Sequence, residues 1–228
     1  MLKPIEAQTM ERFHCLVLGE SGAGKTSLIK TLPKGENTWI LSAESGLLPI
    51  IDLIRSGQVG GWEITSKEDM DAAISALKTP EWQASIKWLV VDSLSEIAGI
   101  YEEHFSKKFP DRKDSFPKWG AYNEHMSKLV RELRDLRPYN IVMTCGVSVE
   151  FDEVKRRHIL PNVPGKGLKE LLPYIFDELL FLAKDEKTGE RLLYTDKFGS
   201  QPGKDRSGKL SLTEPPDLSL IRQKILGE

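Results

Sequence analysis

Residues 19–26 read Gly-Glu-Ser-Gly-Ala-Gly-Lys-Thr and fit the pattern G-x-x-x-x-G-K-[ST] at every position. The apolar run 15–18 precedes this stretch and the apolar pair 28–29 follows it, as a strand–loop–helix unit requires. Glycines let the backbone N–H groups of such a loop turn toward phosphate oxygens, and the helix N-terminus adds partial positive charge. The stretch therefore predicts a phosphate-binding loop (P-loop) for ATP, formed by Gly19, Glu20, Ser21, Gly22, Ala23, Gly24, Lys25, Thr26 and Ser27.

Two side chains of this loop and one further carboxylate have expected roles in binding ATP with Mg²⁺. Lys25 is predicted to neutralise the β- and γ-phosphates as a catalytic residue, and the hydroxyl of Thr26 is predicted to ligate magnesium. Residues 88–92 (Trp-Leu-Val-Val-Asp) form an apolar strand that ends in Asp92. A carboxylate at that strand end can hold the magnesium shell opposite Thr26.

The spacing of the residues leaves open which acid activates water. Ser93 follows Asp92, at the position where many P-loop ATPases carry a glutamate. Glu44 is the other candidate, because it follows the expected strand Thr38–Ser42. Its carboxylate could orient and deprotonate a water in line with the γ-phosphate. A solvated loop residue is the alternative interpretation of Glu44.

Apolar runs of strand length alternate with segments of helical period, which predicts an α/β fold with a mostly parallel central sheet flanked by helices. The expected strands are Phe13–Leu18, Thr38–Ser42, Trp62–Thr65, Ile86–Val91, Asn140–Cys145 and Ile175–Leu182. The expected helices are Lys25–Thr31, Ser66–Lys78, Ser93–Phe105 and Trp119–Leu136. A turn at 186–190 leads into a further strand, Arg191–Thr195, and so predicts a late antiparallel hairpin. Two polar stretches, Ser106–Lys118 and Val147–Gly167, are expected to be long loops.

Composition limits the classes of function. The chain has 228 residues and a net charge of −2 from 32 basic and 34 acidic residues, so nucleic-acid contacts must come from local basic clusters. The two cysteines, Cys15 and Cys145, suggest neither a zinc site nor a disulfide scaffold. No apolar run approaches the length of about 20 residues that spans a bilayer. We expect a single cytoplasmic domain over 1–228, with a core at about 12–196 and an irregular tail, 197–228, that ends in a short helix.

These motifs together resemble the RecA-like ATPase core. The resemblance rests on Gly19–Thr26, on a strand that ends in Ser42-Ala43-Glu44, and on Val90-Val91-Asp92-Ser93. It implies that Glu44 is the catalytic base and that Asn140–Cys145 lies between the P-loop strand and the Asp92 strand. The end of Asn140–Cys145 is then expected to sense the γ-phosphate through Thr144, where RecA-type proteins carry a nearby glutamine. The compact length further resembles the small single-strand-annealing ATPases of phages, which would place the protein in a host cytoplasm.

The same resemblance implies contacts with single-stranded DNA. The two polar stretches fall where RecA-like proteins place DNA-binding loops, and basic groups interleaved with aromatic rings suit phosphates and stacked bases. The alternative is a pair of solvated loops whose aromatic residues pack on the domain. The DNA-binding candidates are Lys107, Lys108, Arg112, Lys113, Trp119, Lys155, Arg156, Arg157 and Lys166.

The resemblance also implies assembly of several copies. Lys204 and Arg206 are comparable to basic residues that RecA-like assemblies insert into a neighbour's nucleotide site, although a charged flexible tail is an equal alternative. Expected partners are single-stranded DNA, a single-strand-binding protein and further copies of the chain. Two other functions stay open: a small-molecule kinase that uses the same loop, and a nucleotide-dependent assembly switch without DNA.

Overall fold

Apolar strands that are buried on both faces form the centre of the structure. The structure is a computed structural model and describes residues 12–44, 46–110, 116–185 and 188–227. In this part of the chain a nine-stranded sheet has the order β11-β9-β8-β1-β5-β4-β2-β3, with β10 paired to β8. The strands are β1 (His14–Leu18), β2 (Thr38–Ser42), β3 (Val59–Glu63), β4 (Trp88–Asp92), β5 (Asn140–Cys145), β8 (Glu178–Lys184), β9 (Arg191–Tyr194), β10 (Lys204–Asp205) and β11 (Thr213–Glu214).

The direction of the strands matches the expected fold class. Strands β8, β1, β5, β4, β2 and β3 run parallel. Strands β9 and β10 pair antiparallel with β8, and β11 pairs antiparallel with β9. The late hairpin β8–β9 is confirmed, and so is the insertion of β5 between β1 and β4. The tail that was expected to be irregular adds β10 and β11 to the sheet before its terminal helix α7 (Leu218–Leu226).

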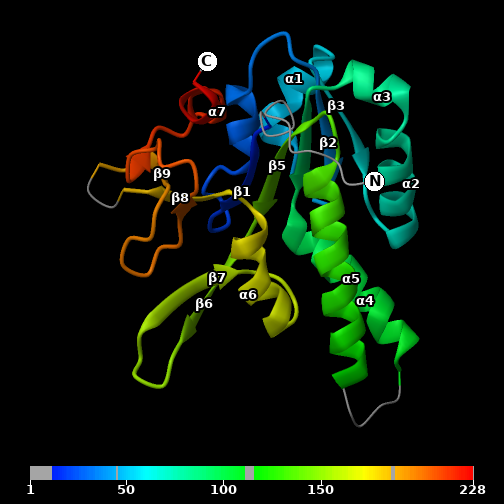
Figure 1. The fold of residues 1–228 in the computed structure, drawn as a ribbon, viewed down its shortest axis with the longest axis vertical. Coiled ribbons are helices and arrows are strands. Elements are labelled where there is room, and N and C mark those ends of the chain that lie inside the picture. Colours follow the sequence, from blue (N-terminus) through cyan, green and yellow to red (C-terminus); the bar gives the residue numbers. More distant parts are fainter. Residues whose placement is uncertain (1–11, 45, 111–115, 186–187, 228) are drawn as a thin grey trace, which may run out of the picture.

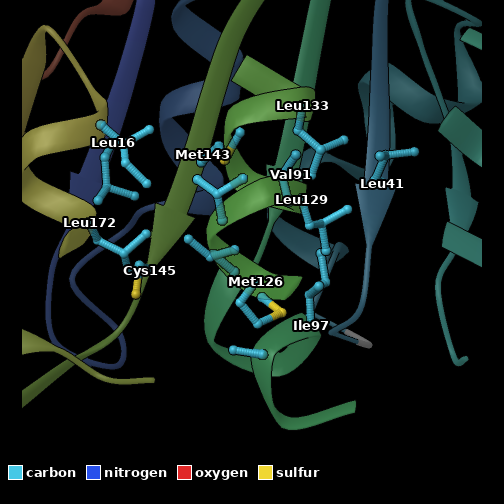
Figure 2. Close-up of a cluster of buried hydrophobic side chains, with 14 of the residues drawn as sticks. Leu16, Leu41, Val91, Ile97, Met126, Leu129, Leu133, Met143, Cys145 and Leu172 are labelled. Atoms are coloured by element: carbon cyan, nitrogen blue, oxygen red, sulfur yellow. The ribbon is translucent and has the colours of Figure 1, made fainter. Parts of the chain in front are cut away.

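Helices cover both faces of the sheet (Figure 1). On one face, α2 (Lys67–Leu77), α4 (Leu94–Lys108), α5 (Phe116–Asp135) and α6 (Lys166–Ile175) pack against alternate strand residues. Figure 2 shows Val91 and Met143 near Leu129 and Leu133 of α5, and Leu16 of β1 near Leu172 of α6. The opposite face packs against α7 and the short helices near the P-loop. Because both faces are buried, the strands are continuously apolar and do not alternate with polar residues.

Short helices and one capped helix complete these layers. The segments η3 (Leu48–Ile50) and α1 (Ile51–Arg55) follow β2, and α3 (Pro80–Ser85) precedes β4. The predicted start of α2 is confirmed, because the Ser66 hydroxyl accepts a hydrogen bond from the Asp69 backbone N–H at 3.1 Å. Among the described residues, no helix has the length and apolar character that crossing a membrane requires.

Several predicted elements differ from the structure. The expected loop Ser106–Lys118 is helical at both ends, since α4 runs to Lys108 and α5 begins at Phe116. After the P-loop the chain forms the 3₁₀ helix η2 (Thr26–Thr31) instead of an α-helix, because Pro33 holds Leu32 in an extended conformation (ψ 151°) and leaves only a short segment. The strand predicted at 62–65 lies earlier, at Val59–Glu63, where it pairs with β2. Gly60 and Gly61 make this edge strand look like a turn in the sequence, yet a Cβ at Gly60 would lie 2.1 Å from the Trp39 ring.

The stretch Val147–Gly167 was predicted to be a loop and is largely structured. Strands β6 (Val147–Phe151) and β7 (Arg157–Pro161) form an antiparallel hairpin, and α6 begins soon afterwards. In the turn, Asp152 Oδ1 accepts hydrogen bonds from the backbone N–H groups of Val154 and Arg156, at 3.0 and 2.8 Å. Few residues of this hairpin are buried, so its sequence lacks the apolar pattern by which core strands are found. The hairpin and the α4–α5 pair both project from the carboxyl edge of the parallel strands (Figure 1).

The carboxyl group of Glu178, at the amino end of β8, is buried and makes stability depend on pH. Burial, together with the charge and hydrogen bond of Asp205, raises the pKa of Glu178 from 4.5 to about 8. The folded state therefore keeps a proton that the unfolded chain loses above its ordinary pKa. We expect the free energy of unfolding to fall, by up to about 4 kcal/mol, as the pH rises from about 4.5 to about 8.

Urea unfolding of the wild type and of Glu178→Gln at pH 5 and pH 8 checks this expectation. The variant is expected to lose less stability over that interval, because its amide does not ionise. The pKa of His14 is lowered mainly by burial, and its contribution is common to both proteins, so the difference between them isolates Glu178. Identical pH dependence in the two proteins would contradict the assignment.

Candidate functional site

The P-loop lies between the end of β1 and the start of η2. Its glycines are required by shape, since a Cβ at Gly19 would lie 2.9 Å from the Leu182 carbonyl oxygen and Gly24 has a φ of +105°. Lys25 Nζ donates hydrogen bonds to the carbonyl oxygens of Gly19 and Glu20, both at 3.0 Å. The lysine thus lies over the loop, where its charge is available to an incoming phosphate.

Asp92 is held by hydroxyl groups from two neighbouring elements. Thr26 Oγ1 donates a hydrogen bond to Asp92 Oδ2 at 2.8 Å, and Thr144 Oγ1 donates to Asp92 Oδ1. Burial raises the pKa of Asp92, while the two hydroxyl donors and the charge of Lys25 act in the opposite direction. Thr144 is only 1% exposed, so it orients Asp92 from within the protein, and a contact of Thr144 with a γ-phosphate stays a prediction.

Glu44 reaches this site through the pairing of β2 with β4. Ser42 lies opposite Asp92 in the parallel register, so the residues after each strand emerge side by side. The Ser93 hydroxyl donates a hydrogen bond to Glu44 Oε1. Glu44 itself is exposed, which leaves its carboxylate accessible from the pocket. The serine after Asp92 therefore positions Glu44, the residue that the resemblance implies to be the catalytic base.

A cavity of about 900 Å³ lies beside these groups. Its lining includes the P-loop residues Lys25 and Thr26, and Glu44 on the side of β2. Further polar residues that the sequence did not suggest also line it, among them Glu96, Asn162 and Arg191. Glu96 lies one helical turn after Asp92, a spacing that could have drawn attention to it. Asn162 and Arg191 come from hairpins distant in sequence and carry no comparable local signal.

The donor set fits a hard divalent cation. The hydroxyl of Thr26 and the carboxylate of Asp92 lie within hydrogen-bonding distance of each other, so one small ion could bind both oxygens. Among the described residues, no group of three or more His, Cys, Asp or Glu side chains is arranged to hold a metal. Mg²⁺ does not need such a group, because it is commonly bound by one or two carboxylates together with substrate phosphates and water.

The candidate DNA-binding residues are divided between the two projections. Lys107 pairs with Glu103 at 2.7 Å near the end of α4, and Lys108 Nζ lies 6.0 Å from the centroid of the Phe105 ring. Arg112 and Lys113 lie outside the described residues. Trp119 packs against the core with its ring centroid 5.6 Å from that of Tyr122, which matches the packed alternative. Its stacking on bases stays a prediction.

The remaining candidates lie on or beside the β6–β7 hairpin. Lys155 and Arg156 belong to its turn, and Arg157 begins β7. Arg157 also lies 3.9 Å from Glu20 of the P-loop, which places the hairpin next to the nucleotide pocket. Lys166 begins α6 and pairs with Glu170 at 3.7 Å. The structure therefore brings the basic residues of this hairpin close to the P-loop.

Lys204 and Arg206 lie at the other end of the sheet from the P-loop in their own chain. Strand β10 pairs with the amino end of β8, whereas the P-loop follows the carboxyl end of β1. Lys204 Nζ donates a hydrogen bond to the Pro173 carbonyl at 2.7 Å, and Arg206 forms an ion pair with Asp177. Their role in a neighbouring subunit's site stays a prediction.

The strand order and the P-loop together define a RecA-like P-loop fold of the nucleoside-triphosphate-binding class, with β5 between the P-loop strand and the Asp92 strand. More particularly, the chain belongs to the AAA domain family, whose profile matches residues 11–207.

Two solved structures are similar to the chain. One is the flagellar accessory protein FlaH from Methanocaldococcus jannaschii, with 11% identity, 88% of this chain and 83% of FlaH covered, and a TM-score of 0.46. The other is an ATPase from the type III secretion system of pathogenic bacteria, with 18% identity and a TM-score of 0.48. That match covers 75% of this chain and 51% of the secretion ATPase. No curated protein sequence matches the chain.

Proposed function

We propose that this protein binds ATP with Mg²⁺ in the cavity beside the P-loop and hydrolyses it. The observation that carries the proposal is the convergence of Lys25, the Thr26–Asp92 pair and the Ser93–Glu44 pair at the ends of adjacent strands. The first two arrangements suit phosphate and metal binding. The third supplies a carboxylate that is oriented and open to the cavity.

Each residue has a separate part in this proposal. The backbone N–H groups of the P-loop and Lys25 hold the phosphate chain, and Lys25 exchanges its loop carbonyl partners for phosphate oxygens. Thr26 and Asp92 hold the magnesium ion, which supplies charge neutralisation on the phosphate oxygens when bound. Glu44 accepts a proton from the attacking water, and Ser93 fixes the orientation of Glu44.

We further propose that the ATPase acts on single-stranded DNA in phage recombination or annealing. A groove of about 980 Å³ supports the DNA part of the proposal. The groove lies between the β6–β7 hairpin, α6 and the segment 197–203. Its lining has one acid, Glu170, and several basic residues: Arg156, Arg157, His158, Lys169 and Lys197. Tyr174 of α6 also lines the groove and is 76% exposed, so its ring is available to stack on a base.

Binding of a labelled oligo-dT strand at several salt concentrations, with ATP and Mg²⁺, tests the DNA part. The double variant Arg156→Ala/Arg157→Ala is expected to weaken binding and to reduce the salt slope by about 1.4, since each contact with a single strand contributes about 0.7. The matched control is Lys30→Ala/Lys34→Ala, which removes the same charge from exposed positions that do not line the groove and is expected to change the slope less.

If the two double variants reduce the salt slope equally, the DNA-binding surface does not lie in the groove. If the wild type binds no single strand at low salt, the recombination function is wrong and the ATPase function is unaffected. Measuring inorganic phosphate release with and without the oligonucleotide separates the remaining classes. Stimulation by DNA supports the proposal, whereas phosphate transfer to a small-molecule acceptor would identify a kinase.

A further inference from the structure

Arg191 lies against the P-loop although 168 positions separate it from its partner there. Its Nε donates a hydrogen bond to the Ala23 carbonyl oxygen at 2.7 Å. The side chain passes directly over Gly24, where an added Cβ would lie 3.1 Å from Nε. Because Gly24 has no side chain, the loop leaves room for an arginine that belongs to a different part of the fold.

The late hairpin holds Arg191 in this place. Arg191 is the first residue of β9 and pairs with Lys184 of β8 in the antiparallel register. The turn between the strands is closed by a hydrogen bond from the Asp185 N–H to the Glu190 carbonyl at 2.7 Å. Because β8 lies next to β1, the start of β9 lies beside the P-loop.

The charges that line the nucleotide cavity give this position a chemical role. Among the described residues that line it, Lys25 and Arg191 are the cations, and Glu44 and Glu96 are the acids. A phosphate chain adds further negative charge, which one lysine does not balance. In the described part of the chain, Arg191 forms no ion pair with a carboxylate, and only Nε is used, on Ala23. The terminal nitrogens of its guanidinium fork suit phosphate oxygens.

We propose that Arg191 binds the phosphate chain of the nucleotide from within the same chain, as a second cation beside Lys25. This inference rests on the proposed ATP site and adds a binding residue to it. The contact on Ala23 holds the guanidinium against the loop, so that little side-chain freedom is lost when the nucleotide binds.

Two substitutions separate the charge of Arg191 from its contact with the loop. In Arg191→Gln, the amide nitrogen can occupy the position of Nε and donate to Ala23, while the charge is lost. In Arg191→Lys, a carbon takes the position of Nε, so the contact with Ala23 is lost while the charge remains. The matched control is Lys184→Gln, which removes one charge from the paired position on β8.

Affinities for ATP, ADP and adenosine, measured by calorimetry with Mg²⁺, test the proposal. Arg191→Gln is expected to weaken ATP and ADP roughly 10- to 150-fold and to leave adenosine affinity and the melting temperature unchanged. Arg191→Lys is expected to retain most of the ATP affinity, and Lys184→Gln to lose less than about threefold.

The opposite result would overturn the proposal. If Arg191→Gln keeps its ATP affinity and Arg191→Lys loses it, Arg191 only supports the loop. An equal loss in Lys184→Gln would also overturn it, because the effect would then be a general effect of charge. If the wild type binds no ATP, the proposed nucleotide site itself is wrong. Wild-type ATP affinity in Arg191→Gln would reject this inference alone.

Discussion

Lys25→Ala is expected to lose ATP hydrolysis by about 10²- to 10³-fold or more, with weaker ATP binding. In the structure, Lys25 Nζ is held by the carbonyl oxygens of Gly19 and Glu20, so its charge lies at the mouth of the phosphate loop. Alanine leaves the backbone N–H groups of the loop in place and removes the one P-loop cation that lines the cavity. The loss is greatest for hydrolysis because negative charge shifts among the phosphate oxygens in the transition state.

Phosphate release and ATP titration on the purified variant measure both effects. Lys30→Ala is the matched control, because Lys30 lies in the last turn of η2, is exposed and does not line the cavity. The control is expected to keep wild-type activity and a wild-type melting temperature. Turnover of Lys25→Ala close to that of the wild type would show that the phosphate site lies elsewhere.

Glu44→Gln is expected to keep its affinity for ATP and to lose kcat by roughly 10²- to 10⁴-fold. The amide has nearly the size of the carboxylate and can still accept the hydrogen bond from Ser93, but it cannot take a proton from water. Affinity is preserved because Glu44 does not bind the phosphates in the proposed mechanism.

Glu96→Gln supplies the comparison for this prediction. Glu96 is the other acid among the described residues that line the cavity, and it lies on the first turn of α4. Single-turnover hydrolysis of the two variants distinguishes the two acids directly. If Glu96→Gln loses turnover while Glu44→Gln retains it, the base is on α4 and the role proposed for Glu44 is wrong.

Much of the fold follows from local sequence patterns. The P-loop is predictable because its function depends on consecutive residues whose glycines and helix start act over a few ångströms. The parallel strands are recognisable because burial on both faces makes them continuously apolar. The β6–β7 hairpin escaped detection because few of its residues are buried. The edge strand β3 was predicted too late in the chain because glycines occupy its centre.

The sequence by itself thus determined the phosphate loop, the apolar strands and the acid that ends β4, since each depends on neighbours along the chain. Only the tertiary structure decided that Ser93 holds Glu44, that Arg191 lies on Ala23, and that Trp119 packs on the core. Strand register and the order of the sheet bring these partners together across long separations. Such contacts leave no periodic pattern in the sequence. Each contact depends on the packing of the whole sheet, and the local preferences of the residues involved do not determine it.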